Sequence, residues 1–276
     1  MTPAVAFVLA GPVLAAQENG RQDPGAYGLG GLRAGFCVQL LLDPATVRKA
    51  LPEGYRPLTA TQAGELHPVV SGVVKGQPEF AAWTPSRLCL YALDTLEAKD
   101  FTYINRKGRK PLLFGLWTAV AEATGGGRQE VALLLLSDNG RLIHSAKSAG
   151  AQVRRAKLLV GKVVPIEEDT IPSPPADRFQ VNIGKTVVTW DGHASSDSTA
   201  TGGQVELVWT AAPDRRGPVG GRLVLRPLWS RGMAGSLRVI GKDDFATALK
   251  ASPVRFAGPQ YERGGGTMQL GVVARQ

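Results

Sequence analysis

Short apolar runs separated by turn residues constrain the fold of this chain most. The first clear run is Phe36–Leu42, and similar runs recur up to Thr267–Val273, with Gly, Pro, Asn or Asp between them. Apolar segments of this length, bounded by turn residues, are typical of strands. We predict further strands over residues 88–93, 113–122, 130–136, 157–164, 179–183, 186–190, 204–209, 221–227 and 234–240. The pattern therefore predicts a mainly β (α+β) chain.

Helix signals are fewer than strand signals. Asp43 followed by Pro44 is typical of a capped helix start, and this helix is expected to end near Leu51. A second helix is expected from Gly140 or Arg141 to about Ala149. We therefore expect two or three short helices beside the strands.

Composition indicates a globular protein. The 276 residues are 43% hydrophobic and 20% charged, which excludes a disordered chain, and no glycine period of the collagen type is present. The polar segments 169–177 and 194–203 are predicted to be loops, and both are too short for an interdomain linker. We expect a single domain over residues 17–276, with an antiparallel sheet that curls or closes into a barrel.

Residues 1–16 are predicted to be either a signal peptide or an N-terminal strand. Residues Ala4–Ala16 are uncharged and largely apolar, although no basic residues precede them. A signal peptide would make the protein secreted or periplasmic; otherwise a cytoplasmic location is expected. Cys37 and Cys89 match neither a metal-binding nor a CxxC spacing. They are expected to form a disulfide in an exported protein and to be buried thiols in a cytoplasmic one.

The positive charge favours an anionic partner. Lys and Arg number 32 against 23 Asp and Glu, a formal net charge of +9. A basic binding protein for a polyanion such as nucleic acid is therefore one alternative, with the basic run 106–110 as its strongest local feature. Nucleic acid is not favoured, because no known nucleic-acid motif accompanies the charge.

Catalytic motifs are scarce. His67, His144 and His193 lack metal-ligand spacing, and no GxSxG nucleophile motif occurs, so no metal or cofactor is expected. Lys147 lies in a small and otherwise uncharged surrounding sequence. A lysine in an apolar pocket is partly neutral and can form a Schiff base with a carbonyl compound, which makes Lys147 the candidate catalytic residue.

Two stretches resemble the acetoacetate-decarboxylase-like superfamily. The opening Arg33–Asp43, followed by Leu51–Pro57, is similar to the family's first strand, short helix and Pro-Gly turn. Four C-terminal segments are similar to the family's closing segments: 235–237, 251–254, 258–261 and 267–271. The resemblance spans most of residues 33–271. The resemblance implies a closed, cone-like β-barrel around an apolar cavity. It also implies a Schiff-base lysine, an arginine near the first strand and pocket glutamates.

Residue by residue, the resemblance is incomplete at the reactive position. Arg33 falls on the family's arginine, and Glu122 lies a few positions from the expected glutamate. The family's Gly-Phe-Pro-Lys-Lys segment falls on Gly150–Arg154, where Val153 and Arg154 replace the lysines. Val153 has no amine, and an arginine stays protonated and cannot act as the nucleophile.

The sequence therefore predicts an acetoacetate-decarboxylase-like protein that has kept the barrel and lost the decarboxylase chemistry. Its expected ligand is a small carboxylate or keto acid bound inside the barrel, with Arg33, Glu122 and Arg154 as substrate-binding residues. A Schiff-base lyase or decarboxylase using Lys147 remains an alternative, as does the polyanion-binding protein. No transmembrane segment is expected, and a homo-oligomer stays open.

Overall fold

The structure is a computed structural model dominated by strands. It describes residues 26–64, 68–98, 101–104, 111–125, 127–148, 151–163, 176–200, 205–210 and 219–272. The strands are β1 (Ala26–Leu42), β2 (Tyr55–Pro57), β3 (Thr84–Ala98), β4 (Phe101–Ile104), β5 (Leu112–Ala123), β6 (Gly127–Ser137), β7 (Val153–Arg155), β8 (Lys157–Val163), β9 (Ala176–Ile183), β10 (Thr186–Ala200), β11 (Val205–Thr210), β12 (Val219–Ile240) and β13 (Arg255–Val272). The helices are α1 (Pro44–Ala50), α2 (Ala60–Ala63), α3 (Pro68–Gly76), the 3₁₀ turn η2 (Pro78–Phe80), α4 (Gly140–Ser148) and α5 (Asp244–Ala251).

Seven strands form a closed ring. The 13-stranded sheet runs in the order β11-β6-β5-β3-β1-β13-β12-β10-β9-β8, and β11 pairs with β12 in addition. The β11–β12 pairing links the first and last of the seven strands from β11 to β12 in this order, and so closes the ring. Most neighbours are antiparallel, whereas β11 and β7 each pair with β6 in parallel. The prediction of a mainly β, closed or curled sheet with a few short helices is confirmed.

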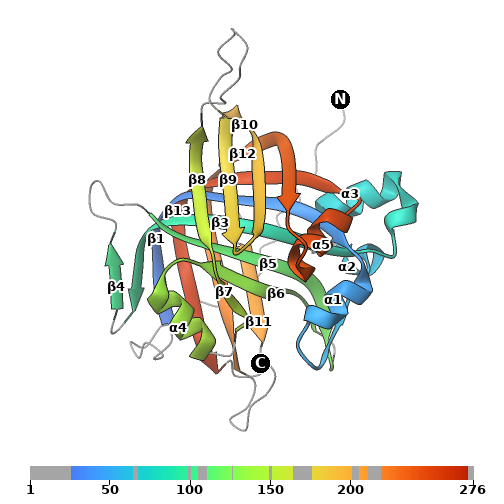
Figure 1. The fold of residues 1–276 in the computed structure, drawn as a ribbon, viewed down its shortest axis with the longest axis horizontal. Helices are drawn as coiled ribbons and strands as arrows, with labels where there is room; N and C mark the ends of the chain where they lie inside the picture. Colours follow the sequence, from blue (N-terminus) through green and yellow to red (C-terminus); the bar gives the residue numbers. More distant parts are fainter. Residues whose placement is uncertain are drawn as a thin grey trace, which may run out of the picture.

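A second layer covers part of the outer face of the ring. The C-terminal half of β12 leaves the ring and pairs with β10, and β9 and β8 follow it across β1 and β3 (Figure 1). The ring of Phe36 on β1 stacks on that of Phe179 with a centroid distance of 4.0 Å, and Trp190 lies 4.4 Å from Phe36. These aromatic contacts, together with the surrounding aliphatic side chains, form an apolar core between the two layers.

The interior of the ring has its own apolar core. Its buried side chains include Tyr27, Leu29, Leu32, Tyr91, Leu93, Phe114, Leu116, Leu135, Leu223, Leu225 and Met268. Helix α4 packs on this core through Leu142 and Ala146. Residues of β1 therefore alternate between two cores, as the period of two in a strand requires.

Local signals explain the helix starts. Asp43 Oδ1 accepts a hydrogen bond of 3.0 Å from the Ala45 amide, and Pro44 occupies the first turn of α1. Asn139 Oδ1 accepts hydrogen bonds from the amides of Arg141 and Leu142 at the start of α4. The two helices expected from these signals are confirmed, and α4 ends at Ser148.

Strand β12 differs from the expectation of two separate strands. It continues from Val219 to Ile240, and β10 pairs with its second half up to Ala200. The first part of the predicted loop 194–203 is therefore strand. A Cβ atom on Gly192 or Gly235 would lie within about 2.5 Å of the Trp190 ring, so these two glycines let the indole pack against the pairing of β10 with β12.

Several sequence predictions lie outside the described residues: residues 1–16, His67 and the basic run 106–110. Among the helices of the described segments, none is long and apolar enough to cross a membrane.

Candidate functional site

A row of four residues crosses the inner wall of the ring. Gln39 lies opposite Arg87, Arg87 lies opposite Thr118, and Thr118 lies opposite Ala132. Directly paired residues of neighbouring strands point to the same face of a sheet. The four side chains therefore share the face that also bears the interior core, and we refer to Gln39, Arg87, Thr118 and Ala132 as the interior row.

Arg87 forms a buried ion pair with Glu130 of β6. Arg87 Nε donates to Glu130 Oε1 at 2.5 Å, and Arg87 Nη2 donates to Oε2. Thr118 Oγ1 also donates to Oε1, so three donors converge on this carboxylate. The side chains of Arg87 and Glu130 are only 16% and 6% exposed. A bidentate pair of this kind compensates much of the cost of removing both charges from water.

Two tyrosines lie near this ion pair. Burial lowers the pKa of the Arg87 guanidinium below its usual range, and the neighbouring Tyr91 and Tyr261 oppose this shift. Burial also raises the pKa of Tyr91 and of Tyr261 above the usual 10.0. Both phenols are therefore neutral at physiological pH and act as hydroxyl groups.

A disulfide lies in the next row of the inner wall. Cys37 on β1 and Cys89 on β3 are directly opposite one another, with a Cα–Cα distance of 4.0 Å, and they are bonded. The Tyr91 hydroxyl lies 3.8 Å from Cys37 Sγ. Of the two alternatives left open for the cysteines, the structure contains the disulfide, which cross-links β1 to β3 beside the interior row.

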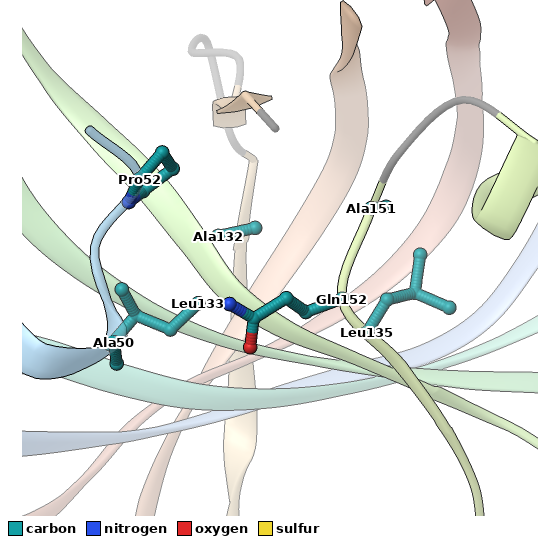
Figure 2. Close-up of a pocket in the computed structure, with 7 residues that line it drawn as sticks. All are labelled: Ala50, Pro52, Ala132, Leu133, Leu135, Ala151 and Gln152. Carbon is teal, nitrogen blue, oxygen red and sulfur yellow. The ribbon is translucent and has the colours of Figure 1, made fainter. Parts of the chain in front are cut away.

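A small pocket opens at the edge of β6, where the interior row ends (Figure 2). Its enclosed space is about 10 Å³, which is room for roughly one water molecule. Its lining residues are Ala50, Pro52, Ala132, Leu133, Leu135, Ala151 and Gln152. Leu133 is the extra residue of a β-bulge, because Trp117 pairs with Leu134 and Thr118 pairs with Ala132. Such bulges interrupt strand pairing and are frequent beside functional sites.

The segment before β7 forms one side of this pocket. The Leu135 amide donates to the Gln152 carbonyl at 2.8 Å, and the Ala151 amide donates to the Ala146 carbonyl at 2.9 Å. The next residue, Val153, pairs with Leu135, and its half-buried side chain packs against the interior core. Val153 therefore occupies an inward-facing position directly beside the pocket.

Lys147 and Arg33 lie outside this interior. Lys147 is an exposed residue near the end of α4, not a residue of an apolar pocket. Arg33 is 54% exposed and its Nε donates to Asp94 Oδ1 at 2.6 Å. Neither residue faces the interior row.

Glu122 and Arg154 also form ion pairs away from the interior row. Glu122 is 19% exposed and forms ion pairs with Arg56 and Arg128. Arg154 is 47% exposed and lies 3.3 Å from Asp243, the residue that caps α5. Arg33, Glu122 and Arg154 thus form ion pairs with other residues and not with one another. Their catalytic or substrate-binding roles remain predictions.

Sequence reasoning missed Arg87 and Glu130. Each is a charged residue next to a strongly apolar run, Arg87 before Leu88–Leu93 and Glu130 before Val131–Leu136. The charge at the start of a buried strand was the sequence signal that could have identified both residues. In the described part of the chain, no group of three or more His, Cys, Asp or Glu side chains could hold a metal ion.

Comparison with known proteins identifies the fold. No protein-family model matches the chain. No curated protein matches it either. Among solved structures, the chain shares the acetoacetate-decarboxylase-like fold, as the sequence resemblance implied.

Three of these structures show the extent of the match. Acetoacetate decarboxylase from Legionella pneumophila aligns over 98% of both chains with a TM-score of 0.54 and 11% identity. The enduracididine biosynthesis enzyme MppR, complexed with pyruvate, aligns over 98% of both chains with a TM-score of 0.52 and 16% identity. An acetoacetate decarboxylase-like enzyme from Sphingomonas wittichii RW1 aligns over 91% of this chain and 93% of its own, with a TM-score of 0.51 and 9% identity. Identities this low establish the shared fold alone.

Proposed function

We propose that this protein binds a small carboxylate- or carbonyl-bearing molecule at the inner wall of the barrel, without the lysine-based decarboxylation typical of its fold family. The observation that carries the proposal is the presence of a valine at position 153. The sequence resemblance places a reactive lysine at this position, and here an aliphatic side chain packs against the interior core beside the pocket. An aliphatic side chain cannot form a Schiff base.

The described lysines offer no substitute. Every lysine whose exposure the structure describes lies at the surface: Lys49, Lys75, Lys147, Lys157, Lys185, Lys242 and Lys250. Desolvation is what activates an amine for attack on a carbonyl, and an exposed lysine lacks it. The Schiff-base alternative through Lys147 is therefore not favoured.

Two features support retained binding. The interior wall is largely apolar but keeps the polar groups of Gln39, Arg87, Thr118 and Glu130. Convergent polar groups in a mostly apolar concave site are typical of small-molecule binding. The structurally similar MppR is complexed with pyruvate, a small keto acid, which makes this chemical class the first to test.

The test combines binding with trapping. Ligand-observed NMR with pyruvate, acetoacetate and their neutral amides should show binding of at least one compound, and the wild-type protein should release no carbon dioxide from acetoacetate. Borohydride treatment in the presence of a keto acid should leave the protein mass unchanged. A reduced adduct, on Lys147 or on any other lysine, would contradict the proposed loss of Schiff-base chemistry.

We also propose that the protein functions in an oxidising compartment. The buried Cys37–Cys89 disulfide supports this location, because such bonds persist outside the reducing cytoplasm. This location can be tested by expressing the protein in a bacterial host with and without an export signal and counting the free thiols of the unfolded protein. The exported protein should contain no free thiol after unfolding, and two free thiols in material isolated from the native compartment would contradict it.

A further inference from the structure

Strand β8 lies at the open edge of the second layer. Among the described strands it pairs with β9 alone, and it is the last strand in the order of the sheet. Figure 1 shows β8 as the outermost of the strands that cross in front of the ring. Its seven residues, Lys157–Val163, contain no proline and pair with β9 without a bulge. The other side of β8 therefore presents a row of backbone donors and acceptors that no described strand uses, and such a row is a template for pairing with a further chain.

The outward face of β8 carries a leucine two residues before a glycine. Leu158 and Val160 pack into the core between the two layers. Leu159 and Gly161 therefore face outward, because side chains alternate along a strand, and Leu159 is 42% exposed although it is aliphatic. The φ angle of Gly161 is not positive, and a Cβ atom at this position would meet no atom within 4 Å. The packing of the protein's own chain thus does not require glycine at position 161.

We infer that β8 is a dimerisation edge, at which it pairs antiparallel with β8 of a second copy of this chain across a two-fold axis at Val160. This register pairs all seven residues of both strands. It places Leu159 opposite Gly161 of the second copy, and Gly161 opposite Leu159 of the second copy. The glycine leaves room for the leucine side chain, and glycine inside a strand often marks the close approach of another chain. The second layers of the two copies then form one continuous sheet.

The residue pattern of β8 favours a second copy over an unrelated strand. An interface between two identical surfaces has to be self-complementary. The exchange of Leu159 and Gly161 across the axis meets this condition twice. The two lysines of the strand are at positions 157 and 162, which lie opposite positions 163 and 158 of the second copy, so like charges do not face one another. The contact uses the outer layer, and it is therefore independent of the proposed ligand binding at the inner wall.

Charge substitutions at the two exchanging positions test the pairing. The double variant L159K/G161K places lysine opposite lysine on both sides of the axis, and L159E/G161E does the same with glutamate. The wild-type protein should sediment as a dimer in analytical ultracentrifugation, and each double variant should raise the dimer dissociation constant at least ~10-fold. An equimolar mixture of the two variants should restore the dimer, because each lysine then faces a glutamate. Both positions are exposed, so the far-UV circular dichroism of each variant should match that of the wild-type protein.

The control S236K/T247K adds two lysines at exposed positions of β12 and α5 and should leave the dissociation constant unchanged. A wild-type protein that stays monomeric at every concentration would overturn the inference, as would double variants that dimerise as tightly as the wild-type protein. A mixture that stays monomeric would overturn the register. If a double variant does not fold, disulfide formation between L159C and G161C chains tests the same register. The mixture should cross-link faster than either single variant alone, and equal rates would overturn the pairing.

Discussion

Val153 pairs directly with Leu135 where β7 joins β6, and its side chain packs into the interior core. Position 153 therefore faces the same interior as Tyr91 and Phe114. It directly follows Gln152 and pairs with Leu135, two residues that line the pocket. Its side chain is aliphatic and carries no amine.

An amine at position 153 should restore carbonyl chemistry. V153K should form a Schiff base with a keto acid, because partial burial favours the neutral amine. Borohydride reduction followed by mass spectrometry should detect one covalent adduct per chain, and peptide mapping should locate it at position 153. V153M is the matched control of similar length and should form none. If folded V153K forms no adduct, position 153 does not face a ligand-accessible interior.

The Arg87–Glu130 pair should stabilise the fold, because each side chain compensates the buried charge of the other. R87M or E130Q alone should lower the free energy of unfolding by about 3–5 kcal/mol, because each leaves one partner buried and unpaired. The double variant R87M/E130Q should lose less than the sum of the two single changes. Urea unfolding of the four proteins measures the coupling energy. Additive losses would show that the two side chains do not interact.

The disulfide should stabilise the barrel by constraining the unfolded chain. Cys37 and Cys89 are 52 residues apart, and closing a loop of this length is worth about 4 kcal/mol in the chain-entropy model. Adding a reductant should lower the free energy of unfolding by about this amount. The double variant C37A/C89A is the control, and its stability should not depend on the reductant. Equal stability of the wild-type protein with and without reductant would contradict the assignment.

Buried tyrosines should make the fold sensitive to alkaline pH. The pKa of Tyr91 is raised by burial above its usual 10.0, so the folded state retains a proton that the unfolded state releases. This contribution to stability is complete below pH 10 and falls as pH rises from there toward the folded-state pKa. Y91F removes the titrating group and should reduce the loss of stability between pH 10 and pH 11.5. An identical pH profile for Y91F and the wild-type protein would assign the loss to other groups.

The sequence predicted those elements whose causes are local. The Asp43-Pro44 pair was sufficient to place the start of α1, because the cap and the fixed proline φ act within one turn. The strand-rich pattern and the resemblance also anticipated the class of fold. The continuous β12 was missed because packing of Trp190 against Gly192 and Gly235, not local propensity, supports that pairing.

The interior site depends on strand register, which local patterns leave undetermined. Arg87 and Glu130 are 43 residues apart and meet only because β3, β5 and β6 align as they do. The run Val131–Leu136 is apolar throughout, so it does not reveal which leucines face inward. The bulge at Leu133 then reverses the alternation within that run. For these reasons the sequence favoured the exposed residues Arg33 and Lys147 over the buried ion pair.

Ligand binding at the pocket can be observed directly by methyl NMR. Protein labelled in the methyl groups of alanine and leucine should be titrated with pyruvamide. We predict concentration-dependent shifts that are largest for Ala132, Leu133, Leu135 and Ala151, with the exposed Leu159 and Leu228 unchanged. The absence of shifts at these four residues under saturating ligand, or shifts confined to other parts of the chain, would contradict a binding site at the inner wall of the barrel.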